Sequence, residues 1–302
     1  MPIRKNRPRK KPGISIVGAG RLGTTLAISL RACGYPLEAL VTRSPATARR
    51  TAALFDAHTP VLAAKQLDQL PPSRIVIVST PDDQITAISK GLARVPAFRS
   101  QTPTVLHTSG ALPSTVFSPL AKLGWHTGSL HPLLSVSEST TAVKLLRGVF
   151  WCVEGGRVAV QQARAIVRDL KGQSFSIDSE KKALYHAAAV MASGNVVAVF
   201  DVAVEMLSRC GLSRKQARQV LLPLLESTVR NLSRSETSEA LTGTFSRGDV
   251  GTVLRHLEAL SGGSFAEARQ LYRLLGGRSL TLAAKNGLDS RTSKSIRRAL
   301  RK

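Results

Sequence analysis

A glycine pattern near the start of the chain is the feature that most constrains its fold. A short β-type run is followed by glycines at the spacing G-x-G-x-x-G, and an apolar helical pattern follows them. Gly18 permits a tight turn from strand to helix, Gly20 lets the backbone approach a pyrophosphate, and Gly23 lets the helix lie close to the sheet. The first helical residues, Arg21 and Leu22, stand at the positive end of the helix dipole. We predict a dinucleotide site; the alternative is a glycine-rich turn without a ligand.

The residues after the second predicted strand bear on which dinucleotide binds. Proteins that bind NAD carry an acidic residue about 20 residues after the glycines, where it holds the ribose 2′-hydroxyl. This chain has Thr42, Arg43 and Ser44 there. The Arg43 guanidinium can hold a 2′-phosphate in a fork, with the two hydroxyls as further donors. Ser44 followed by proline is also a helix N-cap pattern, and the two interpretations are compatible. We therefore predict NADP rather than NAD.

The alternation of strand and helix patterns predicts the fold class. From Gly13 to about residue 178, β-type runs alternate with helical patterns, which indicates βαβ units and a doubly wound, mostly parallel Rossmann sheet. The predicted strands are Ile14–Val17, Leu37–Val41, Ile75–Ser79, Thr104–His107, Thr127–His131, Val149–Val153 and Ser174–Ile177. We assign residues 13–178 to an NADP-binding domain of the α/β class.

Residues 179–284 predict an all-helical domain for substrate binding and dimerisation. A long helical stretch begins near Ser179 and ends near Cys210, with Gly211 in the position of a C-terminal cap. This stretch is apolar on several faces, so we expect it to be buried in a homodimer. Further helices are predicted over Ser213–Leu232, Asp249–Leu260, Ala266–Leu275 and Ser279–Ala284.

Charge and cysteine usage bear on compartment and partners. The net charge is +24, and part of it lies in residues 1–12, a predicted disordered basic tail, and 285–302, a second basic tail. Contact with nucleic acid through these tails stays an alternative, although no aromatic residues interleave there to stack bases. The three cysteines are scattered, so we predict no metal site and a reduced, cytoplasmic setting. The N-terminus lacks the apolar region of a signal peptide, and we expect no membrane-spanning helix.

Polar residues follow the predicted strands at the edge of the sheet where ligands bind in such folds. We expect Thr80 and Pro81 to flank the cofactor, with Asp82 and Asp83 capping the next helix. His107 ends the next predicted strand and Ser109 follows it, where the nicotinamide is expected; a structural histidine is the alternative for His107. His131 precedes a proline that holds it extended, which suits a substrate contact.

The helical half adds the candidates for chemistry. Lys182 and His186 are four residues apart, so they share a helix face and can handle a proton beside a hydride acceptor. Asn195 can donate an amide to substrate, and Arg247 can clamp a carboxylate or phosphate. For each of the four, a structural or solvated role is the alternative.

These motifs, taken in order, resemble a known family. The set is G-A-G-R-L-G, T-R-S, S-T-P-D-D, H-T-S-G-A, L-H-P-L-L-S, K-x-L-Y-H-A-A-A-V and L-T-G-x-x-x-R-G-D. It resembles bacterial Rossmann-like proteins with the C-terminal domain of unknown function 2520, in the 6-phosphogluconate-dehydrogenase-like clan with ketopantoate and pyrroline-5-carboxylate reductases. The resemblance covers residues 13–284 and implies an NADP site and a helical dimerisation half.

Two classes of function follow from these observations. The first is an NADP-dependent oxidoreductase that moves a hydride to or from a small anionic C=O or C=N substrate between the two domains. The second is a non-catalytic NADP-binding redox sensor or scaffold. The polar residues at strand ends and at the start of the long helix favour the enzyme.

Overall fold

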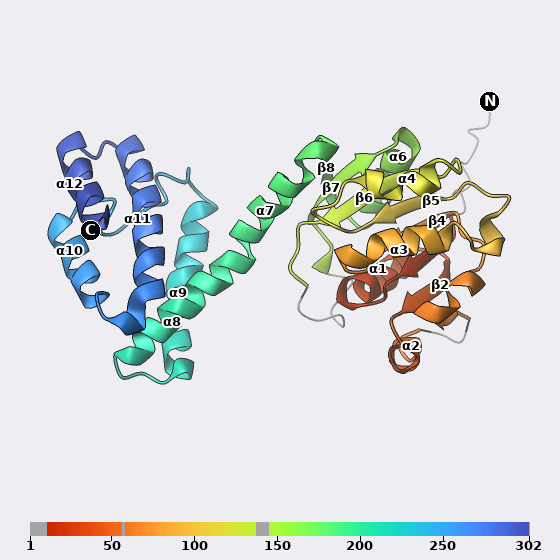
Figure 1. Cartoon of the computed structure of the whole chain (residues 1–302), viewed down its shortest axis with the longest axis horizontal. Helices are drawn as coiled ribbons and strands as arrows, with labels where there is room; N and C mark the ends of the chain where they lie inside the picture. Colours follow the sequence, from red (N-terminus) through yellow and green to blue (C-terminus); the bar gives the residue numbers. More distant parts are fainter. Residues whose placement is uncertain (1–10, 56–57, 137–144, 302) are drawn as a thin grey trace, which may run out of the picture. The chain divides into compact units, whose positions relative to one another are not determined.

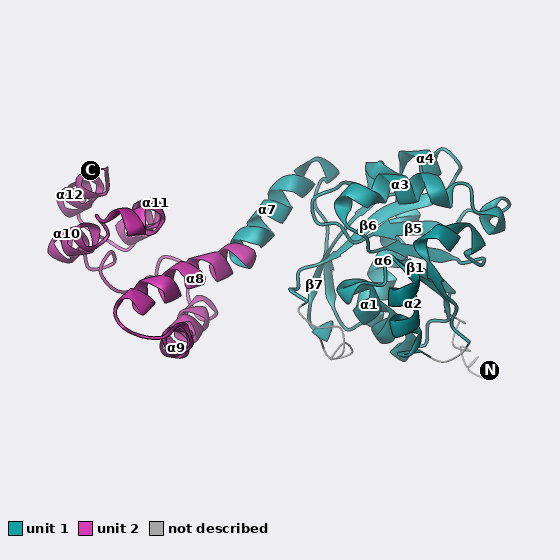
Figure 2. Cartoon of the chain, turned by 60° about the horizontal axis from the view of Figure 1, so that its bottom comes forward, with its two compact units in different colours: residues 1–193 teal, residues 194–302 magenta. Residues whose placement is uncertain are grey.

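The computed structural model describes residues 11–55, 58–136 and 145–301. It divides into two compact units, residues 1–193 and 194–302, which Figure 2 shows in different colours. The division falls inside the predicted long helix rather than near residue 178. Most of the predicted N-terminal tail lies outside the described residues. Lys11 is an exception, because it pairs with Asp169 at 2.8 Å and lies over the ring of Tyr35.

The first unit is built on an eight-stranded sheet in the order β3-β2-β1-β4-β5-β6-β7-β8 (Figure 1). Neighbouring strands are parallel except for β6 and β7, which are antiparallel. The strands are β1 (Ile14–Val17), β2 (Leu37–Thr42), β3 (Val61–Ala63), β4 (Ile75–Val78), β5 (Thr104–His107), β6 (His126–Pro132), β7 (Phe150–Gly155) and β8 (Gln173–Phe175). The predicted α/β Rossmann sheet is confirmed, with the short strand β3 missed.

Helices cover both faces of the sheet, which is why its central strands are almost continuously apolar. The helices α1 (Arg21–Ala32) and α6 (Arg157–Asp169) pack on one face, in a core that includes Leu26 and Ile166. The helices α3 (Asp82–Leu92) and α4 (Ser118–Ala121) pack on the other, with Ile85 and Leu120 buried. Helix α2 (Pro45–Ala52) follows β2, and the Ser44 side chain caps it as predicted, accepting from the Thr47 amide.

The second unit is helical. Its helices are α8 (Gly194–Arg209), α9 (Arg214–Leu232), α10 (Val250–Ala259), α11 (Ala266–Lys285) and α12 (Ser290–Arg301). Its core combines α10, α11 and α12 through residues that include Val253, Leu280 and Leu300. Asp249 caps α10 by accepting from the Thr252 amide at 2.9 Å, which confirms the predicted helix start.

Two predictions for this unit are wrong. Residues 285–302 are not a solvated tail over their described part, because Ile296, Ala299 and Leu300 of α12 are buried in the core. The predicted helices 266–275 and 279–284 are a single helix that continues through Gly276 and Gly277. A Cβ on Gly276 would stand 2.7 Å from the Phe245 ring, so the missing side chain serves close packing rather than a helix break.

The predicted long helix is two helices in the structure, α7 (Lys182–Ala192) at the end of the first unit and α8 at the start of the second. The helical path breaks at Ser193 (φ −129°, ψ −80°), whose hydroxyl donates to the Ala189 carbonyl at 2.8 Å. The stretch Ser179–Arg209 is long and apolar enough to cross a membrane by length and composition. Residues 183–200 hold no Asp, Glu, Lys or Arg, and the expectation of no membrane-spanning helix stays a prediction. One such stretch is weak evidence of a membrane span.

Candidate functional site

The glycine loop has the geometry that a bound pyrophosphate needs. Gly18 has φ +100°, and a Cβ there would lie 2.6 Å from the Ser79 carbonyl. A Cβ on Gly23 would lie 2.1 Å from the Gly18 carbonyl oxygen, so the start of α1 can approach the loop only with glycine. Gly20 faces open space, with no atom within 4 Å of its Cβ position. The first three amides of α1 have no acceptor inside the helix and stand free for an anion.

A cleft of about 270 Å³ opens beside this loop, at the carboxyl ends of β1, β2 and β4. It is lined by the glycine loop, by Thr42 and Arg43 at the end of β2, and by Thr80 and Pro81 after β4. Apolar side chains that the sequence analysis did not single out form another wall, namely Ala64, Leu67 and Ile88. This is the position of a dinucleotide site in doubly wound sheets, and the residues fit the adenosine half of the cofactor.

The three residues predicted to read the ribose take different positions. Arg43 is exposed, lines the cleft, and has no hydrogen bond or ion pair within the described residues. The Thr42 hydroxyl is buried and donates to the Ser44 carbonyl at 3.2 Å. The Ser44 hydroxyl caps α2, and Thr47 rather than Ser44 lines the cleft. Of these three residues, Arg43 is thus the one whose side chain is unpaired in the described part of the chain and lines the cleft.

Lys182 occupies an unusual place at the start of α7. Its side chain is only 1% exposed, and its Nζ donates to the Ser109 carbonyl at 3.1 Å and to the Ser129 hydroxyl at 2.8 Å. Burial lowers the pKa of Lys182, and the two neutral acceptors bring no negative charge to offset this shift. The negative charge of more distant groups opposes the shift. Two of its three N–H donors are used, which leaves one for another acceptor.

His131 on β6 faces two aromatic side chains of α7. Its Nδ1 is 2.7 Å from the Tyr185 hydroxyl, and its ring meets that of His186 edge to face at 5.7 Å. A Cβ on Gly110 would lie 2.8 Å from His131 Nε2 and 2.3 Å from His186 Cδ2. The glycine therefore lets the turn after β5 lie against both imidazoles. Sequence reasoning missed Gly110 and Tyr185, although both lie inside the quoted motifs.

Lys182, His131, Tyr185 and His186 form a cluster, the Lys182 cluster, and hydrogen bonds connect its surroundings to the cofactor cleft. The Thr108 hydroxyl donates to the Ser79 hydroxyl at 3.2 Å, and Ser79 lines the cleft. The Ser109 hydroxyl donates to Asp82 Oδ2 at 2.9 Å and accepts from two amides of its own turn. Asp82 thus holds Ser109 from the first turn of α3 and does not serve as the predicted side-chain cap.

Two further buried groups support the cluster. Glu154 on β7 accepts from both the amide and the hydroxyl of Ser114 at 2.8 Å, which fixes the segment η3 (Ser114–Phe117). Burial raises the pKa of the Cys152 thiol, which lies near Tyr185. These residues are far apart in the sequence, and their spacing carries no motif that could have revealed them.

His107 is placed in the core. It is fully buried, and its ring packs edge to face on Phe117 at 5.3 Å. Burial, helped by the charge of Lys182, lowers its pKa to about 3. The structure supports the alternative prediction, in which His107 is a structural histidine.

Asn195 and Arg247 belong to the second unit. Asn195 is exposed in the first turn of α8, and Arg247 is exposed on the turn before α10. Their roles in substrate binding stay predictions.

Two histidines with lowered pKa values, the buried His107 and the half-buried His131, make stability depend on pH. Burial lowers the pKa of His131 to about 4, while an unfolded histidine titrates near 6.5. The unfolded chain therefore binds more protons between these values, and the free energy of unfolding falls as the pH drops from about 6.5 towards 4. Each pKa unit corresponds to about 1.4 kcal/mol. We expect His107→Leu to flatten this slope in urea unfolding at pH 7 and pH 5. An unchanged slope in His107→Leu would contradict the assignment.

Comparison with known proteins agrees with this architecture. Residues 3–132 match the Rossmann-like domain and residues 149–279 match the domain of unknown function DUF2520. Among curated proteins, no relative matches. A protein of Bacteroides fragilis assigned as an NADP oxidoreductase is 23% identical, with a TM-score of 0.72 over 90% of this chain and 99% of that one.

Two solved reductases share the fold at lower identity. The 1-pyrroline-5-carboxylate reductase of Streptococcus pyogenes is 15% identical, with a TM-score of 0.58 over 97% of this chain and 100% of its own. The pyrroline carboxylate reductase of Plasmodium falciparum, solved with NADP bound, is 11% identical, with a TM-score of 0.55 over 97% of each chain. At these identities the likeness establishes the fold.

Proposed function

Since a Rossmann-like domain matches residues 3–132 and DUF2520 matches residues 149–279, we propose that the chain is an NADP-dependent oxidoreductase acting on a small anionic C=O or C=N substrate. The observation that carries this proposal is a continuous site at one edge of the sheet. The glycine loop opens onto a cleft, and the Ser79–Thr108 hydrogen bond leads from that cleft to the turn held by Lys182. A cleft for a cofactor beside a buried proton-bearing side chain is what hydride transfer to C=O or C=N requires.

The residues around the cleft fit an NADP cofactor. The free amides of α1 would hold the pyrophosphate, and the unpaired guanidinium of Arg43 would hold the 2′-phosphate. The buried Thr80 hydroxyl oxygen has no hydrogen-bond partner in the described residues, which leaves it for a ligand at this cleft. When bound, the nicotinamide supplies or accepts the hydride. The NADP-bound reductase with the same fold supports the choice.

The chain's own residues would move the proton. Lys182 is held by two neutral acceptors and keeps one N–H donor free, so it can give a proton to the substrate oxygen or nitrogen. Burial lowers its pKa towards the working range of a general acid. His131, neutral above about pH 4 and fixed by Tyr185, would position the substrate together with His186.

A substrate screen tests the proposal. Small keto acids and cyclic imine acids are mixed with NADPH and the full chain, and the loss of NADPH absorbance is followed. We expect one chemical class to be reduced with one product formed per NADPH consumed. Tight NADPH binding without turnover on any acid of either class would favour the redox sensor or scaffold.

We also propose that two copies of the chain associate through the second unit. Its helices expose large apolar side chains, namely Val197, Val220, Leu222, Leu224, Val229, Leu232 and Leu274. Large exposed apolar patches mark interaction sites, and a second copy of the chain would cover these side chains. The apolar stretch Ser179–Arg209 would then be buried between protomers rather than in a membrane.

Light scattering in detergent-free buffer checks the dimer. We expect a dimer at micromolar concentration, and a shift towards monomer for Leu224→Asp, whose leucine is 64% exposed in a single chain. Leu123→Asp changes an exposed leucine of the first unit and should leave the dimer intact. A monomeric wild-type chain, or a chain recovered only with membranes, would contradict the proposal.

A further inference from the structure

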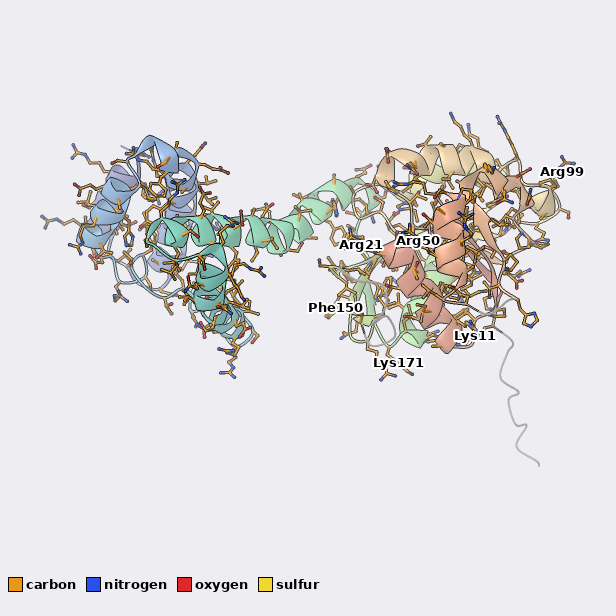
Figure 3. All side chains as sticks on the ribbon, turned by 90° about the horizontal axis from the view of Figure 1, so that it is seen from below. Lys11, Arg21, Arg50, Arg99, Phe150 and Lys171 are labelled. Atoms are coloured by element: carbon orange, nitrogen blue, oxygen red, sulfur yellow. The ribbon has the colours of Figure 1, made fainter. Side chains whose placement is uncertain are left out.

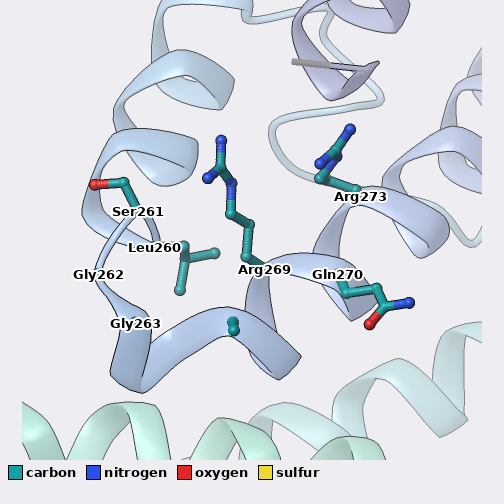
Figure 4. Close-up of a pocket in the computed structure, with 8 residues that line it drawn as sticks. Leu260, Ser261, Gly262, Gly263, Arg269, Gln270 and Arg273 are labelled. Carbon is teal, nitrogen blue, oxygen red and sulfur yellow. The ribbon is translucent and has the colours of Figure 1, made fainter.

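A second cavity lies wholly inside the helical unit, between the end of α10 and the first turns of α11 (Figure 4). Its volume is about 390 Å³. Leu260 and Ala266 give it an apolar side, and the loop Ser261–Gly263 closes one end. Arg269 and Arg273 supply the only charged side chains among the residues that line it. No part of the proposed cofactor site contributes to this cavity.

The two arginines are arranged as a pair. They stand four residues apart on α11 and so share one face of the helix. Figure 4 shows both guanidinium groups on the same side, with Gln270 turned away from them. Neither arginine has an ion-pair partner within residues 11–55, 58–136 and 145–301. The cavity therefore presents uncompensated positive charge within the described chain.

Hydrogen bonding points to a missing acceptor. The Nε of Arg269 is buried and has no hydrogen-bond partner among the described residues. A buried donor without an acceptor costs about 1–3 kcal/mol, and more when it is charged. The Nε of Arg273 donates to the Leu300 carbonyl, which orients that guanidinium and leaves its terminal N–H groups unused in the described chain.

The loop beside the arginines leaves its backbone accessible. A Cβ on Gly263 would meet no atom within 4 Å, and one on Gly262 would meet only the Ser264 hydroxyl, at 4.0 Å. Without side chains at these two positions, a ligand in the cavity can approach the main chain closely.

We propose that this cavity, the Arg269 pocket, binds a compact oxyanion on a short carbon skeleton, a phosphate monoester or a small polycarboxylate. Both groups present several oxygens to planar guanidinium forks, and Arg binds such oxygens in pairs. The volume lies at the small end of the range for ligand sites, which suits a ligand of a few carbon atoms. Leu260 and Ala266 would contact that skeleton. The pocket does not depend on the proposed oxidoreductase activity.

Calorimetric titration of the full chain tests the pocket, with glycerol phosphate, inorganic phosphate and citrate as probes. NADP⁺ is kept saturating so that anions do not report on the cofactor cleft. We expect one saturable site for glycerol phosphate or for citrate, and the probe that binds identifies the ligand group. Arg269→Gln and Arg273→Gln should each lower the affinity at least about tenfold, as expected for a charge-assisted contact of about 1.5–3 kcal/mol.

Arg278→Gln is the matched control, because it removes the same charge from an exposed position on α11 outside the pocket. It should leave the affinity unchanged. An equal loss in Arg278→Gln would show general attraction to a protein of net charge +24 and overturn the proposal. Failure of all three probes to bind the wild-type chain would overturn it as well.

A second variant separates a binding role from a structural one. Arg269→Met removes the buried donor and keeps most of the side-chain volume. In anion-free buffer we expect its unfolding temperature to equal or exceed that of the wild type, because no acceptor is lost. Added ligand should raise the wild-type unfolding temperature and not that of the variant. A lower unfolding temperature together with unchanged ligand affinity would assign Arg269 to structure alone.

Discussion

Lys182→Met is expected to lower turnover by about 10²–10⁴-fold, the usual contribution of a general acid, and to leave NADPH affinity unchanged. The Nζ lies against the turn after β5 and against β6, bonded to Ser109 and Ser129, and Lys182 is not one of the residues that line the cofactor cleft. Methionine retains the length of the side chain but cannot carry the proton. Steady-state kinetics on a substrate found by the NADPH screen, with fluorescence titration of NADPH, measure the two effects separately.

The neighbouring lysine provides a matched control. Lys181 is 69% exposed and pairs with Asp178 at 2.9 Å, so Lys181→Met removes the same charge one residue away without touching the cluster. It should retain wild-type turnover. The dependence of turnover on pH adds an independent readout. The part of this pH profile that is caused by titration of Lys182 should disappear in Lys182→Met and not in Lys181→Met. If Lys182→Met loses NADPH affinity and unfolds at lower temperature, the lysine has a structural role instead.

Arg43→Ala is expected to remove a preference for NADPH over NADH of roughly tenfold to hundredfold. A charge-assisted fork on the 2′-phosphate contributes about 1.5–3 kcal/mol, and NADH has no such phosphate. Affinity for NADH should therefore stay unchanged. Fluorescence titration of both cofactors against wild type and variant gives the four dissociation constants that are needed.

General electrostatic attraction must be separated from recognition of the 2′-phosphate. Basic side chains project from many parts of the first unit, among them Lys11, Arg50, Arg99 and Lys171 (Figure 3). Arg50 lies in the last turn of α2, outside the cleft, so Arg50→Ala removes one charge and should preserve the preference. If Arg43→Ala weakens NADH as much as NADPH, the assignment to the 2′-phosphate is wrong.

Features set by neighbouring residues could be predicted from the sequence. The positive φ of Gly18, the Ser44 cap with proline at the next position and the Asp249 cap each depend on a few adjacent residues. The mostly parallel Rossmann sheet followed from the alternation of strand and helix patterns. Helix α12 shows a limit of this approach: its apolar residues Ile296 and Leu300 carry helical spacing, but the high charge of the segment concealed a packed face.

Features set by tertiary contact could not be predicted. His107 and His131 each lie at the end of a parallel strand, and both faces of such a sheet are covered, so the pattern does not tell which imidazole enters the core. The 2.7 Å contact between His131 and Tyr185 joins residues 54 positions apart. The burial of Lys182 likewise depends on acceptors in the turn after β5 and on β6, and no spacing in the sequence indicates them.

The central claim is that the glycine loop and the Lys182 cluster serve one reaction. A crystal structure of the full chain with NADP⁺ bound tests it most directly. We predict that the 2′-phosphate lies on Arg43 and that the nicotinamide ring contacts the turn at Ser109 and Gly110, beside His131. A nicotinamide ring that lies away from this turn, or a cofactor bound outside the cleft of the glycine loop, would contradict the claim.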